Sequence, residues 1–273
     1  MAFVTTEGFG CGWNETATDT PLVTALTVGI TTAREPVCKR GLAVNIAASL
    51  ARDSSRSLRV CVVDADPLNL DVTTRLAVRG PLLEDFAAGA GPDWSALGSV
   101  HEPPLWVLPS AGAGVGLTHR AFGPALAHLR ESFDVIVCDL VGGVSAPGMP
   151  GAGSLDSLDW LLVAATPDAE PVADAARFVE RFRSAQDHGD IAGSIGVGIV
   201  TSGDECSIEL EPGTVSSVLE CPVLGSVPQL WGRAAPNLGF GAALGIAELD
   251  EAVDALYERL VTVRAGLSFS RAS

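Results

Sequence analysis

The stretch that most constrains the fold is residues 27–52, which read TVGITTAREPVCKRGLAVNIAASLAR. It opens with a short apolar run at Val28 and Ile30, which predicts a buried strand. It closes with apolar residues at a spacing of three or four, which predict a helix; these are Leu42, Ile46, Ala47 and Leu50. An irregular loop, residues 34–41, lies between them. A strand, a loop and a helix in this order form the setting in which a phosphate-binding loop occurs.

This stretch resembles the start of the ParA/MinD-type P-loop ATPases (SIMIBI class), whose deviant Walker A loop reads KGGxGKT[TS] before a helix beginning xAVNLA. On that pattern Arg34 stands at the signature-lysine position and Lys39 at the P-loop lysine position. Arg40 stands where the family has its magnesium-binding Thr or Ser, and Gly41 follows it. The resemblance implies that these four residues surround a nucleotide or another anion.

The loop departs from the family pattern at positions that phosphate binding normally requires. Glu35, Pro36 and Cys38 replace three glycines, which would allow consecutive backbone N–H groups to turn inward. Pro36 has no N–H to donate. Arg40 cannot ligate magnesium, because a guanidinium only donates hydrogen bonds. We therefore expect a degenerate member that has lost ordinary Mg-ATP hydrolysis, although its cations can still hold an anion.

Lys39 is the single lysine of the chain, and it falls at the P-loop position. Two interpretations stay open at this point. In the first, Lys39 still contacts a phosphate; in the second, it is an inherited relic of an ancestral ATPase.

The length of 273 residues favours one large α/β domain, and a hydrophobic fraction of 47% is ample for its core. We assign residues 25–264 to that domain, residues 1–24 to a flexible polar leader and residues 265–273 to a C-terminal tail. No apolar run reaches the roughly 20 residues that span a bilayer, and the leader does not resemble a signal peptide. A cytoplasmic location is the expectation.

The formal net charge of −16 argues against nucleic-acid binding, which depends on basic side chains that neutralise phosphates. The six cysteines occur singly, and the four histidines have no metal-ligand spacing. Cys61 and Cys138 lie within predicted strands, so we expect them to be small buried hydrophobic residues. Cys38, in the loop, is the one cysteine with a position that suggests reactivity.

The second motif of the chain is acidic. It reads Asp64-Ala65-Asp66 and directly follows the apolar run at residues 58–63. Carboxylates at the carboxyl end of a parallel strand face the crevice in which open α/β sheets bind ligands. The resemblance implies that Asp64 serves magnesium and water positioning and that Asp66 belongs to the nucleotide site. The alternative is that this stretch only begins a helix, with Asp71 as its N-cap.

The third motif is the run at residues 133–143, FDVIVCDLVGG, which resembles the family's Walker B strand. The resemblance implies that Asp139 holds magnesium through water. The Gly/Pro-rich residues 142–153 fall where the family has a switch region and part of its dimer face. We interpret them as a mobile contact loop, with plain disorder as the alternative.

The rest of the chain alternates predicted strands and helices. Thr201 stands where the family often has an adenine-reading Asn, which weakens the case for an adenosine pocket, and Pro228 matches a family proline near the base. The glycine cluster at residues 111–116 is read as a loop rather than a dinucleotide site. Strands are predicted at residues 105–109, 160–166, 196–200 and 222–228, and helices at 82–88, 122–132, 167–183, 215–219 and 246–264. The tail after residue 264 is too weakly basic and apolar for a membrane helix.

These observations predict a mostly parallel, doubly wound sheet with helices on both faces. They favour a pseudo-ATPase scaffold, similar to septum-site-determining or TadZ/CpaE-like proteins. Such a scaffold positions cellular machinery for cell division, pilus assembly or segregation through protein contacts. Whether the protein forms a homodimer stays open. ATP or ADP with magnesium is the cofactor that the resemblance implies and the altered loop argues against. The alternatives are an active ATPase using Lys39, Asp64 and Asp139, and a module that binds another anion.

Overall fold

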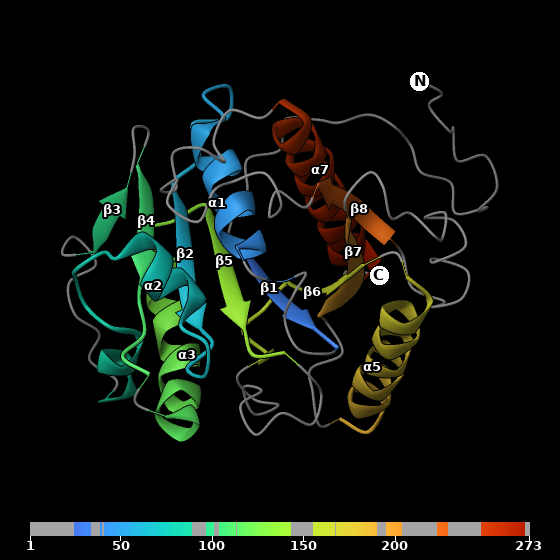
Figure 1. Ribbon diagram of the computed structural model, residues 1–273, viewed down its shortest axis with the longest axis horizontal. Helices are drawn as coiled ribbons and strands as arrows, with labels where there is room; N and C mark the ends of the chain where they lie inside the picture. The colour runs from blue at the N-terminus through green and yellow to red at the C-terminus, as the bar shows by residue number, and fades with distance from the viewer. Residues whose placement is uncertain are drawn as a thin grey trace.

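The computed structural model has an α/β architecture with a mostly parallel sheet (Figure 1). It describes residues 25–33, 39, 41–88, 97–100, 104–112, 114–142, 155–166, 168–189, 195–203, 223–228 and 247–270. Within these ranges eight strands pair in the order β3-β4-β2-β5-β1-β6-β7-β8. The strands are β1 Leu26–Thr32, β2 Val60–Ala65, β3 Gly98–Val100, β4 Leu105–Leu108, β5 Val135–Leu140, β6 Trp160–Ala165, β7 Gly196–Gly203 and β8 Val223–Pro228. The predicted fold class is therefore confirmed.

The central strands are mostly apolar because helices cover the sheet on both faces. Every residue of β1, β2, β5 and β6 is buried. On one face α1, α2 and α7 pack in a core with the inward side chains of the sheet, and on the other face η1, α3 and α5 do so (Figure 1). The helices are α1 Leu42–Arg52, α2 Asp71–Leu76, the 3-10 helix η1 Leu83–Ala88, α3 Val115–Leu129, α5 Ala169–Asp187 and α7 Ala247–Ser270.

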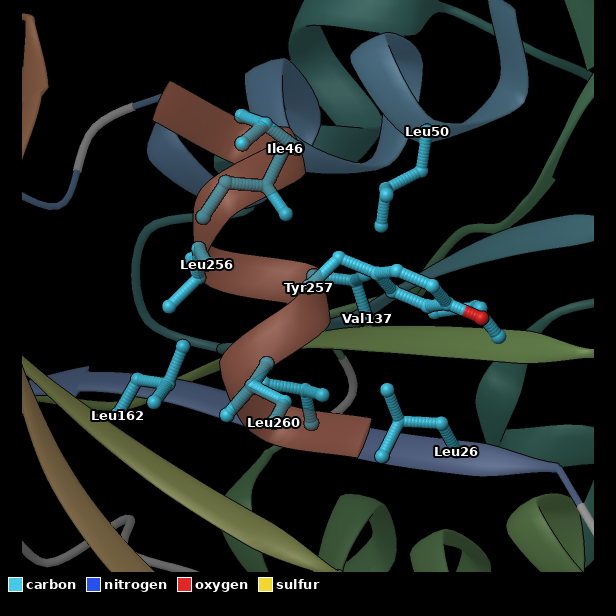
Figure 2. Close-up of a pocket in the computed structure, with 11 residues that line it drawn as sticks. Leu26, Ile46, Leu50, Val137, Leu162, Leu256, Tyr257 and Leu260 are labelled. Atoms are coloured by element: carbon cyan, nitrogen blue, oxygen red, sulfur yellow. The ribbon is translucent and has the colours of Figure 1, made fainter. Parts of the chain in front are cut away.

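The layer between α1, α7 and the sheet contains an entirely apolar cavity (Figure 2). Figure 2 shows Leu256, Tyr257 and Leu260 of α7 around it, opposite Leu26 and Leu162 of the sheet. Its volume of about 10 Å³ is no more than one water molecule requires, and its lining offers no polar partner. It is a packing defect and not a ligand site.

The strand order places the end of β1 at the centre of the molecule. β1 lies between β5 and β6, and the chain winds from it first toward β2 and later toward β6. In the register, Ile30 pairs with Asp139, and Asp64 pairs with the same Asp139 from the other side. The carboxyl ends of β1, β2 and β5 therefore meet where open α/β sheets bind ligands.

Several elements differ from the sequence predictions. The helix predicted at residues 122–132 begins at Val115, so the prediction of a loop up to Gly116 is wrong. This helix packs against η1, and tertiary packing of this kind outweighs the low helix propensity of glycine. The short antiparallel edge strand β3 was not predicted, and α7 continues beyond residue 264 to Ser270.

Other predictions fall wholly or partly on residues outside the described ranges. These are the leader at residues 1–24, most of the contact loop at 142–153 and the helix at 215–219. In the part of the chain that the structure describes, no helix is both long enough and apolar enough to cross a bilayer.

Candidate functional site

Four charged side chains meet at the carboxyl edge of the sheet. Asp64 is on β2, Asp139 is on β5, and Asp66 directly follows β2. Lys39 lies in the connection between β1 and α1. All four residues are at most 2% exposed. We call these four residues the carboxylate–lysine cluster; it contains three acids and one base.

Lys39 is held by two carboxylates and a carbonyl group. Its Nζ donates to Asp66 Oδ2 at 2.8 Å and to the carbonyl oxygen of Leu140, and it lies 2.9 Å from Asp139 Oδ1. Burial lowers the pKa of Lys39, but the charges of Asp139 and Asp66 outweigh it, so the pKa lies above its ordinary value. Lys39 is therefore a charged ammonium whose donors already have partners inside the protein.

Asp66 is the best-paired carboxylate of the cluster. Besides Lys39, it accepts hydrogen bonds from the backbone N–H groups of Leu68 and Asn69 and from Asn69 Nδ2. Burial acts to raise the pKa of Asp66, but Lys39 and these donors leave it below its ordinary value. Asp66 is therefore the anion that balances the charge of Lys39.

Asp64 is bound by a neighbouring helix and not by Lys39. Its Oδ2 accepts from the backbone N–H of Thr73 at 2.8 Å and from Thr73 Oγ1 at 2.6 Å, and its Oδ1 accepts from the N–H of Asp66 at 3.3 Å. Burial raises the pKa of Asp64 to about 6, against the opposing effect of the Thr73 bonds. The carboxylate therefore anchors α2 to the end of β2.

Asp139 is the carboxylate of the cluster whose negative charge is least well compensated. Burial raises its pKa to about 7; Lys39 opposes the rise, and the negative charge of Asp64 adds to it. Its Oδ1 contacts the Lys39 ammonium but makes no hydrogen bond of good geometry with any residue that the structure describes. A cluster with three acids and one base thus retains an extra proton close to neutral pH.

The N-terminus of α1 carries an anion supplied by the protein itself. The backbone N–H of Gly41, which precedes α1, donates to Asp71 Oδ2 at 2.8 Å. The same oxygen lies 2.9 Å from Arg75 Nε. The alternative that Asp71 caps its own helix is wrong: α2 begins at Asp71, its N-cap is Leu70, and no side chain caps it.

A chain of hydrogen bonds leads away from Asp64, and the sequence analysis missed it. Thr73 Oγ1 accepts from the N–H of Ser110 at 2.9 Å, and Ser110 Oγ donates to Glu84 Oε1 at 2.6 Å. Glu84, which is 8% exposed, also accepts from Thr118 of α3. No spacing in the sequence signals this chain, since its members lie on four separate segments; a buried glutamate in η1 is visible only in three dimensions.

The remaining predicted site residues are placed as follows. Thr201 is buried on β7, and its Oγ1 donates to the carbonyl oxygen of Gly225 at 3.5 Å, within the sheet. Pro228 ends β8, where its backbone pairs with Gly203. In the strand order, β1 and β6 lie between β5, which carries Asp139, and the two strands β7 and β8. Arg34 and Arg40 lie outside the described residues.

The residues that are described do not fit a magnesium ion. Both oxygens of Asp64 accept hydrogen bonds from the protein, and Asp139 faces the Lys39 ammonium. In the described part of the chain no three His, Cys, Asp or Glu side chains form a group that could hold a metal. The sequence also places Arg40 where the ATPase pattern has its magnesium-binding hydroxyl.

Solved structures with the same fold cover most of this chain. The septum site-determining protein MinD complexed with Mg-ADP from Pyrococcus horikoshii OT3 matches with a TM-score of 0.65 and 15% identity, over 89% of this chain and 98% of that chain. A ParA family ATPase from Chlorobium tepidum TLS matches with a TM-score of 0.65 and 18% identity, over 85% and 98%.

A third match comes from the MinC:MinD cell division protein complex of Aquifex aeolicus, with a TM-score of 0.59 and 17% identity, over 88% of this chain and 96% of that chain. No protein-family model matches the sequence, and no curated protein matches it significantly. The chain therefore has the fold of the MinD/ParA-type ATPases, which confirms the predicted resemblance at the level of structure.

Proposed function

We propose that this protein is a MinD/ParA-like scaffold that binds adenine nucleotide weakly, does not hydrolyse it, and positions cellular machinery through protein contacts. The observation that carries the proposal is that carboxylates of the protein already bind the Lys39 ammonium. The one lysine of the chain is buried, with its ammonium bound to Asp66 and Asp139. A phosphate that approaches must compete with two carboxylates for this cation.

The same arrangement argues against efficient phosphoryl transfer. Catalysis of that reaction depends on cations, above all Mg²⁺, that neutralise charge developing on the transferred group. Here Asp64 is engaged by Thr73, Asp139 has a pKa of about 7, and Arg40 replaces the metal-binding hydroxyl. The residues with which a metal would have to be held are therefore engaged or altered.

Protein partners are the expected ligands at the surface. A related MinD chain has been solved in a complex with MinC, which gives a precedent for such contacts in this fold. The net charge of −16 disfavours nucleic acid as the partner. Cell division, pilus assembly and segregation are the processes in which a positioning role of this kind would be sought first.

The test is calorimetric titration of ATP and ADP, with and without magnesium, combined with a hydrolysis assay. The comparison is with a Lys39→Met/Asp66→Asn variant, which removes the ammonium together with the carboxylate that balances its charge. We expect weak binding by the native protein, loss of binding in the variant and no turnover. Magnesium-dependent turnover that the variant lacks would replace the proposal with an active ATPase.

The third possibility, a different anionic ligand, has a separate readout. A thermal-shift screen of phosphorylated and carboxylated metabolites would raise the melting temperature with the true ligand, since binding to the folded state alone stabilises it. A shift with such a ligand, together with no response to ATP or ADP, would contradict the nucleotide part of the proposal.

A further inference from the structure

Asp71 connects two elements that are distant in sequence. It is the first residue of α2, yet its Oδ2 accepts the N–H of Gly41 at the start of α1, at 2.8 Å. The first turn of α1 contains no acidic residue of its own. The Asp71 side chain is 17% exposed and thus largely covered. The anion at the N-terminus of α1 is therefore supplied by another helix.

This position is one where phosphate groups bind to proteins. The first N–H groups of a helix lack an intrahelical acceptor, and the helix dipole favours negative charge there. Asp71 Oδ2 is contacted by a backbone N–H and by the guanidinium of Arg75, a pair of donors that phosphate oxygens also use. We propose that the Asp71 carboxylate is a built-in competitor for the anion position at α1 and thereby sets the nucleotide affinity.

The backbone on either side of α2 supports this proposal. Leu70 has a φ of 49° and Ala77 a φ of 47°, so both ends of α2 are left-handed residues other than glycine. Such residues are uncommon and persist only where surrounding contacts hold them. The contacts that hold α2 at its polar side are Asp71 to Gly41 and Thr73 to Asp64. Loss of the first contact would leave α2 with strained ends and one fewer attachment.

The competition has a thermodynamic consequence. A phosphate can take the Gly41 N–H only in molecules from which the carboxylate has moved away, so the observed affinity is reduced by the fraction of such molecules. Removal of the carboxylate should therefore tighten binding. This inference rests on the proposed function, because it assumes that the phosphates of a nucleotide bind at the start of α1.

The experiment measures ADP binding by calorimetry to the native protein, to Asp71→Ala and to Glu131→Gln. Glu131 is exposed just after α3, before β5 begins, at the opposite edge of the sheet, so its variant controls for the change in net charge. A charge-assisted hydrogen bond that no longer competes corresponds to an affinity gain of about tenfold or more. Should Asp71→Ala fold poorly, Asp71→Asn, which keeps an acceptor oxygen, should give an intermediate gain.

Hydrogen–deuterium exchange of the native protein separates displacement from a simple charge effect. If ADP displaces Asp71, deuterium uptake should rise in residues 71–76 when ADP is added. Tighter binding by Asp71→Ala with no rise in uptake would mean that charge alone acts, and it would overturn the inference. Equal affinity in the native protein and Asp71→Ala would also overturn it, while leaving the proposed function intact. No ADP binding by any of the proteins at millimolar concentration would reject the proposed function, and this inference with it.

Discussion

The amino and carboxyl edges of the sheet both carry acidic side chains, but the charges of these side chains are balanced differently at the two edges. At the amino edge, Arg59 forms a two-point pair with Asp134, through Nε at 3.1 Å and a terminal nitrogen at 2.9 Å. Arg59 is 55% exposed, and its hydrogen bonds hold the pKa of Asp134 below the ordinary value. At the carboxyl edge, Asp66 and Asp139 share the buried Lys39, Asp64 lies beside them without contacting it, and the pKa of Asp139 rises to about 7. One edge has paired charges in water, and the other, among the described residues, has an excess of buried acid.

The difference points to the carboxyl edge as the place at which function should be tested. Exposed ion pairs add little to the free energy of unfolding. An unbalanced cluster of buried charges lowers it and persists only where other interactions hold the cluster together. Native proteins tolerate such local conflicts mainly at functional sites. The conflict lies at the carboxyl edge, where α/β sheets bind their ligands, and the first three of the four predictions that follow test this contrast.

The largest effect is expected from Lys39→Met. The substitution leaves the carboxylates of Asp66 and Asp139 buried without their cation, so the free energy of unfolding should fall by about 3–5 kcal/mol, as measured by urea denaturation. The matched control at the other edge is Arg59→Met, which should lower it by at most about 1 kcal/mol, because that pair is exposed. Similar losses in the two variants would remove the contrast between the edges.

The next effect is a pH dependence of stability that originates in Asp139. In the unfolded chain this carboxyl releases its proton near its ordinary pKa of 3.8, but in the folded protein it does so near 7. Between these values the folded state binds more protons, so the free energy of unfolding decreases as the pH rises, by an amount on the order of a few kcal/mol. Asp64, with a pKa of about 6, acts in the same direction.

Asp139→Asn is the variant that isolates this pH effect. Urea denaturation at a series of pH values should give a flatter profile for the variant between about pH 4 and 7. Asp66 has a pKa below its ordinary 3.8, so its contribution to stability is lost only under more acidic conditions and does not blur the comparison. A profile as steep as that of the native protein would show that Asp139 titrates normally.

A smaller effect is expected at the amino edge from Arg130→Met. Arg130 donates to Thr27 Oγ1 at 2.7 Å and to the carbonyl oxygen of Ser157 at 2.8 Å, and it is about one-third exposed. Its loss should lower the free energy of unfolding by about 1 kcal/mol. Chemical denaturation should also show an unchanged pH profile between about pH 4 and 7. A changed profile would mean that the two edges are coupled.

The smallest effect concerns the apolar cavity between α1, α7 and the sheet (Figure 2). Val253 lines it and is fully buried. Val253→Ile adds one methylene group toward a space that is otherwise empty, and it should raise the free energy of unfolding by about 0.5 kcal/mol. Thermal denaturation measures the change. A loss of stability would show that the surrounding side chains leave no room for the group.

The sequence was informative where the periodicity was strong. The mostly apolar runs that became β1, β2, β5 and β6 and the 3–4 pattern of α1 were predictable, and their order determined the parallel topology. The start of α3 was not predictable, because its first turn includes Gly116 and is stabilised by packing against η1. The three-residue strand β3 is too short to give a periodic signal.

The sequence predicted which charged residues form the candidate site, but it did not predict which side chains contact one another there. The pattern indicated Lys39, Asp64, Asp66 and Asp139 as one site, and the structure brings these four residues together. Whether they bind a nucleotide stays a prediction. The contact of Asp71 with Gly41 was not foreseen, because residues 30 positions apart, at the starts of two helices, meet only through tertiary packing.

The central claim is that Lys39 is charged and held inside the fold by Asp66 and Asp139. Because Lys39 is the only lysine of the chain, protein labelled with ¹⁵N at lysine Nζ gives a single side-chain NMR signal. We predict that this signal shows slow proton exchange and titrates above the ordinary pKa of 10.5. An ammonium that exchanges rapidly and titrates at or below 10.5 would be free in solvent, and that result would contradict the account.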